Sequence, residues 1–124
     1  MTVESGFQIA TEEHEHFLLT TVRGPATLAD FFNVIERTAE AVRRGHQRRV
    51  LIDLRETTQN LKFTEHLQLG ARVAERLAFV DKVATIVPAA SKTGSSEKAA
   101  QKNGLDLRTF THFKDALEWL VSET

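Results

Sequence analysis

The sequence contains no cysteine among its 124 residues, and it has no long apolar segment. Without cysteine there are no disulfide bonds, no thiolate metal ligands and no cysteine nucleophile, which agrees with a reducing cytosol. Nowhere do about 18 apolar residues occur together, as a membrane-spanning helix requires. The N-terminus also lacks the basic segment and the apolar run of an export signal. We therefore predict a cytoplasmic protein without a transmembrane segment.

The chain also lacks an excess of charge of either sign. Its 16 Lys and Arg residues face 17 Asp and Glu residues, so the formal net charge is −1. No overall field attracts nucleic acid or an anionic membrane, and we predict neither as a partner. A chain of this length buries enough surface to fold without a covalent staple, and we interpret residues 1–124 as a single domain.

The clearest positive signal is the run Arg-Val-Leu-Ile-Asp-Leu-Arg at residues 49–55. Its branched apolar residues occupy both alternating faces, which is typical of a strand in the interior of a sheet. The run ends in Asp53 and Arg55 and continues into a polar loop. We therefore predict an interior strand that delivers charged side chains to the edge of the sheet at its carboxyl end.

Strand and helix patterns fill the first part of the chain. Residues 6–11 and 17–23 have strand patterns separated by a short charged turn, which predicts an opening hairpin. Thr27 and Asp30 have the spacing of a capping pair, so a helix should begin there. Gly45 suits the left-handed conformation in which many helices end.

The same alternation continues to the C-terminus. Helix patterns occur at 63–77, 95–104 and 113–121, and strand patterns occur at 82–88 and 107–111. The element order β-β-α-β-α-β-α-β-α predicts an α/β fold with a mixed sheet. It should contain an N-terminal hairpin, followed by right-handed crossover helices that leave the last four strands parallel.

The strands at 50–55 and 82–87, together with the ending Phe-Thr-His-Phe-Lys-Asp-Ala-Leu-Glu-Trp-Leu at 110–120, are similar to the SpoIIAA-like family of bacterial proteins. That family is related to the STAS domains of anti-sigma-factor antagonists. The resemblance covers nearly the whole chain, and the ending is its most specific part. It implies a mixed sheet of the SpoIIAA/STAS type and a role in regulation or ligand binding without catalysis.

The resemblance also implies a place for a phosphorylation switch. Antagonists of this kind carry a phosphorylated serine in an Asp-Ser element where the helix after the central strand begins. Residues 60–66 here, Asn-Leu-Lys-Phe-Thr-Glu-His, contain no serine, and Thr64 is the nearest hydroxyl by position. A phosphate on Thr64 would be favoured by the amides and dipole of a helix N-terminus. The alternative is that Thr64 only caps the helix.

The family is further described as resembling small lipid-carrier folds, in which helices open over an apolar cavity. The side chains that could line such a pocket here are Phe31, Phe32, Phe63, Leu67, Phe113 and Trp119. The alternative is that they simply form the hydrophobic core, since apolar stripes at helical spacing usually do.

No motif in the sequence supports catalysis, a metal site or a cofactor. His14 and His16 stand two apart in an acidic turn, but a firm zinc site needs a third ligand. The segment at 92–98, Lys-Thr-Gly-Ser-Ser-Glu-Lys, lacks the spacing of β-lactamase or P-loop motifs, which leaves an anion site or a plain loop. The cations at 43–49 indicate a solvated turn, with a site for an acidic partner as the alternative. Asp53 lies beside cations that lower the pKa of a carboxylate, which suits binding more than acid catalysis.

Our leading hypothesis is a non-enzymatic regulatory or ligand-binding domain. It would bind a protein partner or a small ligand at the carboxyl edge of its parallel strands. The residues predicted for that rim are Arg23, Asp53, Arg55, Thr57, Thr58, Ser91, Lys92, Thr93 and Ser95.

Two further hypotheses come from other classes. A carrier or sensor of a small apolar molecule would need a cavity on the order of several hundred cubic ångströms between the helices. A small hydrolase would need Asp53 within hydrogen-bond reach of a His or Ser. If the helices cover only one face of the sheet, a second chain must cover the other, and a homodimer is then expected.

Overall fold

The computed structural model describes residues 6–91 and 94–122. Within these residues, the strands are β1 (Gln8–Glu13), β2 (Leu18–Pro25), β3 (Arg49–Thr58), β4 (Lys82–Ile86) and β5 (Leu107–Phe110). The α-helices are α1 (Leu28–Gly45), α2 (Phe63–Arg76), α3 (Ser95–Lys102) and α4 (Phe113–Val121), and a short 3₁₀ helix, η1, covers Ala89–Ser91. None of the described helices combines the length and the apolar character needed to cross a membrane.

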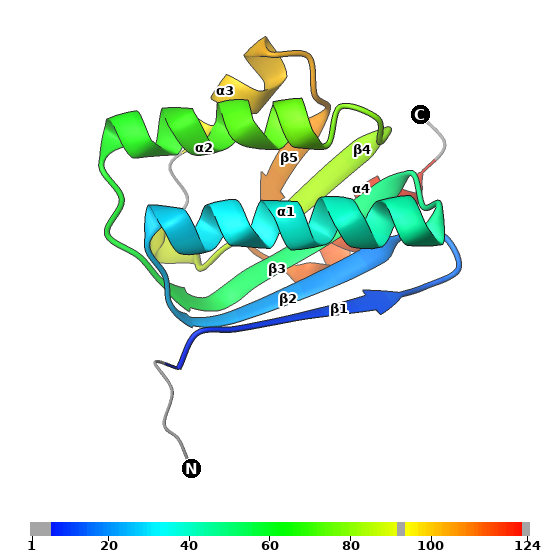
Figure 1. The fold of residues 1–124 in the computed structure, drawn as a ribbon, viewed down its shortest axis with the longest axis horizontal. Helices are drawn as coiled ribbons and strands as arrows, with labels where there is room; N and C mark the ends of the chain where they lie inside the picture. Colours follow the sequence, from blue (N-terminus) through cyan, green and yellow to red (C-terminus); the bar gives the residue numbers. More distant parts are fainter. Residues whose placement is uncertain (1–5, 92–93, 123–124) are drawn as a thin grey trace.

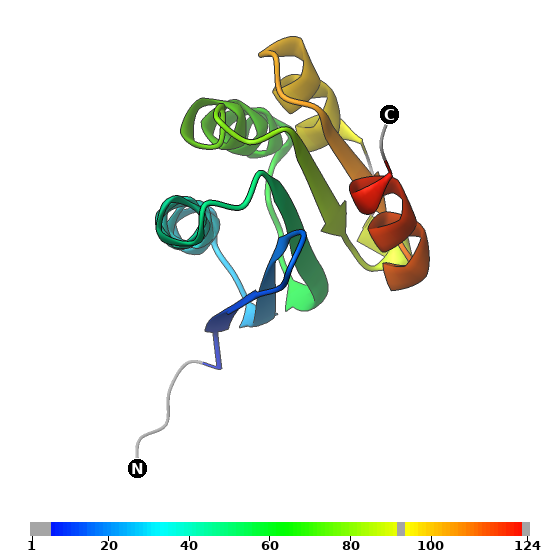
Figure 2. The same cartoon turned by 90° about the vertical axis from the view of Figure 1, so that its right-hand side faces the viewer.

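The strands lie side by side in the order β1-β2-β3-β4-β5, the same order as in the sequence. β1 and β2 pair antiparallel, and β2 to β5 are parallel to one another. This confirms the predicted hairpin and the four parallel strands. Because each crossover moves one strand further in the same direction, right-handed connections place α1, α2 and α3 on one face of the sheet. Figure 2 shows α1 and α2 on that face and α4 on the opposite one.

The start of α1 follows from its sequence, but its end differs from the prediction. The Asp30 amide donates to Thr27 Oγ1 at 3.2 Å and the Thr27 amide donates to Asp30 Oδ2 at 2.9 Å, which is the predicted capping box. The left-handed residue is His46, with φ of 63°, and not Gly45. Gly45 is the last helical residue, where a Cβ would collide with the side chain of Gln47 and approach Glu13. Gly45 therefore has no left-handed backbone, and a Cβ there would require the flexible ends of Gln47 and Glu13 to shift.

Two separate apolar layers cover the two faces of the sheet. Val50 on β3 belongs to the larger layer, between the sheet and α1, α2 and α3. Leu51, the next residue, belongs to the smaller layer, where Ala116 and Leu120 of α4 pack. Val50 and Leu51 both have 0% of their surface exposed, so β3 is the interior strand predicted from residues 49–55.

The cover supplied by α4 bears on the expectation of a homodimer. That expectation held only if the helices left one face of the interior strands bare. α4 instead lies against β3, β4 and β5 on the face opposite α1 and α2. The central strands therefore need no second chain to shield them from water. The condition under which a homodimer was expected is not met.

Two cations from the sheet hold the end of α4. Arg49 Nη1, at the start of β3, donates to the Leu120 carbonyl at 3.0 Å. Lys82 Nζ, at the start of β4, donates to the carbonyls of Trp119 and Ser122 at 3.1 and 3.2 Å. The last carbonyls of a helix have no partner within it, and its C-terminus carries a partial negative charge. Lys82 is only 5% exposed, so these bonds are protected from water.

We expect Lys82→Met to weaken the attachment of α4. The substitution keeps most of the apolar stem but leaves buried carbonyls without their donor, which should lower the free energy of unfolding by about 1–3 kcal/mol. Urea unfolding followed by the fluorescence of Trp119, the single tryptophan, measures this loss. Lys114→Met, at an exposed position on α4, is the matched control and should change stability little. Equal stability of the two variants would contradict the assigned role of Lys82.

Candidate functional site

The predicted rim residues do not form one cluster, because the register of β3 against β2 shifts by one residue after Asp53 and places Thr57 on the face opposite Asp53 and Arg55. Arg55 lies with its guanidinium carbon 5.6 Å from the centre of the Phe113 ring, on the α4 face. Asp53 pairs with Arg55, and Arg23 pairs with Glu56, Nε to Oε1, at 3.4 Å. Thr57 is buried on the other face, among residues that line a cavity. One predicted site is therefore two separate surfaces.

Two of the remaining rim residues, Thr58 and Ser95, lie within the described residues. Thr58 is exposed, and its carbonyl accepts a hydrogen bond from the Ala26 amide at 2.9 Å. Ser95 is the first residue of α3. The backbone of Ser91 ends η1. The side chain of Ser91, together with Lys92 and Thr93, lies outside the described residues, so these predictions remain untested.

Asp53 and Arg55 form a two-pronged ion pair. Arg55 Nε donates to Asp53 Oδ1 at 3.0 Å and Arg55 Nη2 donates to Oδ2 at 2.8 Å. The Arg55 backbone amide also donates to Oδ1, at 3.1 Å. Burial by itself raises the pKa of Asp53, but the hydrogen bonds from Arg55 and the charges of Arg55 and Arg23 outweigh it and hold the pKa below its ordinary value. The pair confirms the expected contact and leaves Asp53 poorly suited to donate a proton.

The other surface is a cavity of about 120 Å³ at the carboxyl ends of β3, β4 and β5. It lies beneath α1, α2 and α3, and its apolar walls include Phe31, Val34, Ile52, Leu54 and Val87. In Figure 1 this is the left-hand end of the molecule, where β3 leads into α2. The cavity thus lies at the edge of the sheet where ligands gather in open α/β folds, and where the sequence analysis predicted a binding rim.

The polar side of the cavity includes His66, which the sequence did not single out as a site, and two residues of the segment 92–98, Ser96 and Glu97. His66 Nδ1 lies 3.2 Å from Ser96 Oγ, and Ser96 Oγ donates to the His66 carbonyl at 3.1 Å. Glu97 accepts hydrogen bonds from the Thr109 amide at 3.1 Å and from Gln101 Nε2 at 3.2 Å. His66 on α2 and Ser96 on α3 are 30 positions apart in sequence, so only folding brings them together.

Gly70 explains why α2 and α3 lie so close at this cavity. A Cβ on Gly70 would collide with the Ser96 carbonyl and with Ala99. The sequence had suggested that small residues on the buried line of this helix serve close packing, and Gly70 packs against α3. This glycine is the signal that could have drawn attention to the neighbouring His66 and Ser96.

The residues predicted to line an apolar pocket are distributed over four environments, which corrects that prediction. Phe31 lines the cavity. Phe32 lies under the guanidinium of Arg72, whose carbon is 4.2 Å from the ring centre. The others lie outside the cavity: Phe63 and Leu67 are exposed, and Phe113 and Trp119 pack in the α4 layer. The helical stripe pattern was the same in each case, so it could not tell pocket from core or surface.

Thr64 does not cap α2. The N-cap residue is Lys62, whose amide donates to Glu65 Oε1 at 2.8 Å. Thr64 is the second residue of the helix, and its side chain is exposed. The hydroxyl at the predicted phosphorylation site is therefore at the surface, in the first turn of α2.

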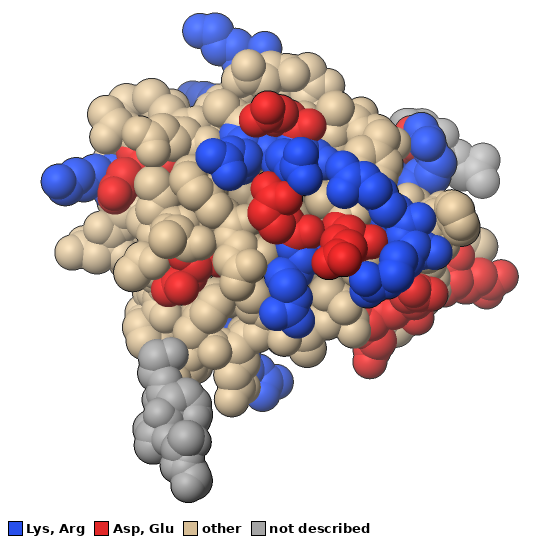
Figure 3. Space-filling view, in the orientation of Figure 1, with Lys and Arg blue, Asp and Glu red and all other residues tan. Residues whose placement is uncertain are grey.

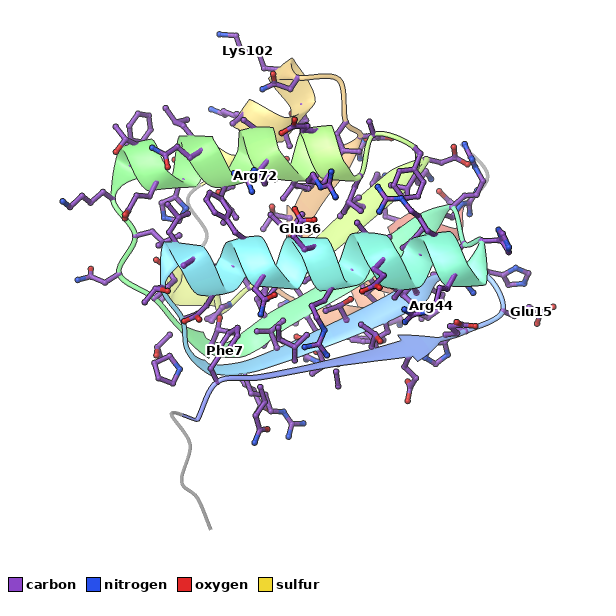
Figure 4. The ribbon with its side chains drawn as sticks, in the orientation of Figure 1. Phe7, Glu15, Glu36, Arg44, Arg72 and Lys102 are labelled. Atoms are coloured by element: carbon purple, nitrogen blue, oxygen red, sulfur yellow. The ribbon has the colours of Figure 1, made fainter. Side chains whose placement is uncertain are left out.

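Charged side chains of both signs cover the face formed by α1 and α2. Figure 3 shows them mostly over the centre and right of this face, with one basic and one acidic group at the left-hand end, where α2 begins. Glu36 of α1 and Arg72 of α2 lie in the seam between the helices (Figure 4). Glu36 accepts from Arg76 Nη2 at 2.8 Å. Among the described residues, no group of three or more His, Asp or Glu could hold a metal ion.

Comparison with known proteins assigns the family. The family model described as SpoIIAA-like matches residues 17–121, most of the chain. The protein belongs to the SpoIIAA-like family. The resemblance inferred from the strands and from the ending at 110–120 is thereby confirmed. A search of curated protein sequences gives no significant match.

Solved structures share the SpoIIAA-like fold at low sequence identity. An uncharacterised protein from Shewanella loihica with a SpoIIAA-like fold is 20% identical, with a TM-score of 0.57 over 97% of this chain and 98% of that one. An anti-sigma factor antagonist from Mycobacterium paratuberculosis is 16% identical, with a TM-score of 0.63 over 98% and 100%. The antagonist SpoIIAA in its unphosphorylated form is 10% identical, with a TM-score of 0.56 over 91% and 96%. At these identities the likeness concerns the fold alone.

The lowered pKa of Asp53 predicts a pH-dependent contribution to stability. Because the pKa is lower in the folded chain, ionised Asp53 stabilises the fold above the ordinary Asp pKa of about 4, and this is lost as the pH falls through the folded value. Asp53→Asn should therefore be less stable than the wild type at pH 7, by about 1 kcal/mol or less, since Arg55 is partly exposed.

Urea unfolding at a series of pH values tests this. The two stability curves should converge in acid. Asp106→Asn, at an exposed position, is the control. It should leave the change in the free energy of unfolding between neutral and acid pH the same as in the wild type. A gap between wild type and Asp53→Asn that persists at the lowest pH would contradict the assignment to the ionised pair.

Proposed function

We propose that this SpoIIAA-like protein is a non-enzymatic regulatory domain that binds a protein partner at the carboxyl end of its parallel strands, through an apolar patch at the start of α2. The observation that carries the proposal is the exposure of Phe63 and Leu67, at 65% and 38%. The two residues are four apart on one helix, so they lie on the same side, one turn from each other. We call these two side chains the α2 patch.

An exposed phenylalanine is unfavourable in an isolated protein and useful in a complex. Fully burying an apolar side chain of this size contributes about 1.5–3 kcal/mol, and aromatic side chains are enriched among the residues that dominate binding energy. The helix has an inward face that already includes Gly70 and Val73, so the α2 patch is not needed for the core.

The side chains that could support catalysis already make hydrogen bonds that disfavour it. Both carboxylate oxygens of Asp53 are bonded to Arg55, so the acid that a hydrolase would need is already paired. Ser96 gives its one hydroxyl proton to the His66 carbonyl and so accepts from His66 Nδ1. A serine nucleophile needs the opposite arrangement, in which the histidine accepts the serine proton. This supports a binding role without chemistry.

Removal of the α2 patch tests the proposal. The double variant Phe63→Ser/Leu67→Ser should fold normally, because both side chains are exposed, but should lose partner binding by about a hundredfold. The protein is immobilised and exposed to lysate of the source organism, captured proteins are quantified by mass spectrometry, and the affinity of the purified partner is then measured. Val121→Ser removes the exposed apolar side chain of α4 and should leave binding unchanged.

The outcome that contradicts the proposal is a partner bound equally by wild type, double variant and Val121→Ser. Concentration-dependent self-association that disappears in the double variant would also contradict it, because the patch would then be covered by a second copy. Light scattering of the purified protein distinguishes this case from capture of a different protein.

We also propose that phosphorylation of Thr64 would control this contact. Thr64 is exposed and lies on the first turn of α2, next to Phe63. A phosphate there would be compatible with the helix N-terminus but would place charge beside an apolar contact. Thr64→Glu should keep the fold and weaken partner binding by about tenfold. Asn33→Asp adds one negative charge at an exposed position of α1 and should have little effect; equal effects of the two would refute the role of Thr64.

A further inference from the structure

We propose that the cavity beneath α1, α2 and α3 binds a small uncharged molecule that consists of one ring or a short branched chain and carries a single hydroxyl group. This site is separate from the α2 patch: its walls use the inward residues of α2, such as His66 and Val73, while the patch uses the outward ones. The proposal therefore stands or falls independently of partner binding.

The size of the cavity sets the size of the ligand. Sites for drug-sized molecules have volumes of about 300–1,000 Å³, whereas an apolar cavity of about 150 Å³ is known to take benzene. The cavity here, at about 120 Å³, is close to the second case. A lipid chain is too large for this volume. The carrier hypothesis required a cavity on the order of several hundred cubic ångströms, and this cavity is smaller. The apolar walls of Phe31, Val34 and Ile52 favour a compact apolar body.

The charges around the cavity set the charge of the ligand. None of the described residues that line it is Lys or Arg, and Glu97 is the acidic one among them. Both oxygens of Glu97 accept bonds from neutral donors, the Thr109 amide and Gln101. Among the described lining residues, an anion would have to leave water and lie near this carboxylate with no cation to pair with, which is strongly unfavourable. The cavity therefore selects against carboxylates and phosphates.

The hydrogen bonds of His66 set the polar group of the ligand. Because Ser96 Oγ donates its proton to the His66 carbonyl, His66 Nδ1 must carry the hydrogen of the bond that joins it to Ser96 Oγ. In the neutral ring Nε2 is then the acceptor, and neither of these two bonds uses it. A ligand hydroxyl is the simplest group that can donate to this nitrogen. His66 thus offers a ligand hydroxyl a directional contact on the polar side of a mainly apolar cavity.

Three probes of similar size test the proposal: benzyl alcohol, toluene and benzoate. Each is titrated into the full chain labelled with nitrogen-15, and backbone amide shifts are followed by NMR. Benzyl alcohol should shift the amides of Gly70, Thr85 and Thr109, which line the cavity, and the shifts should saturate. Benzoate should bind about tenfold more weakly or worse, because it brings an unpaired charge.

Variants separate the cavity from the surface and the hydroxyl from the ring. Val87→Phe fills the cavity and should weaken benzyl alcohol at least about tenfold, whereas Val121→Phe, on α4, should not. Leu61→Trp, from the loop before α2, is a second filling variant with the same expected loss if Val87→Phe does not fold. His66→Leu should weaken benzyl alcohol about fivefold and leave toluene unchanged, since one hydrogen bond contributes about 1 kcal/mol.

Three results would overturn the proposal. The first is the absence of saturable shifts at the cavity amides with benzyl alcohol. The second is equal loss of binding in the Val87 and Val121 variants, which would place the probe on the surface. The third is benzoate, or the longer carboxylate octanoate, binding as tightly as benzyl alcohol at the same amides, which would identify an anion site.

Discussion

The structure depends on one constraint: the two central strands are apolar on both faces, so both faces must be shielded from water. Val50 and Leu51 of β3 are fully buried although they point in opposite directions. The three crossover helices can cover only one face, because right-handed connections between strands added in one direction all lie on the same side. The other face requires α4, and two cations at the start of β3 and β4, Arg49 and Lys82, bind its final carbonyls. Arg49, the last of the cations at 43–49, therefore serves to hold α4 in place.

The same alternation decides what each side of the carboxyl edge can do. Asp53 and Arg55 point to the α4 face, where they satisfy each other. Leu54 points to the opposite face, and the register shift after Asp53 brings Thr57 there too, beside a cavity that the side chains of α1, α2 and α3 do not fill. A paired carboxylate with a lowered pKa contributes to stability, whereas an incompletely filled apolar space can accept a ligand. The two neighbouring surfaces thus have different physical roles.

Helix α2 joins the two binding surfaces that we propose. Gly70 and Val73 are buried against α3 and the core, while Phe63 and Leu67, at the start of the same apolar series, are exposed. In the sequence these residues form one line, since Phe63, Leu67, Gly70 and Ala74 recur at helical spacing. In the first turns of the helix His66 turns inward and meets Ser96 of α3, whereas Phe63 and Leu67 lie on the outward side. That geometry, and not the composition of the line, leaves the phenylalanine at the surface.

The sequence by itself determined the order of the elements, the interior position of residues 49–55, the parallel strands, the capping box at Thr27 and the family. These follow from local periodicity and from the handedness of connections, which depend on near neighbours in the chain. Only the tertiary structure decided that α4 covers the second face, that the rim divides into an ion pair and a cavity, and that His66 meets Ser96. Those outcomes depend on contacts between residues 30 or more positions apart and on the side of the sheet to which a helix packs. A local sequence pattern reports neither of these.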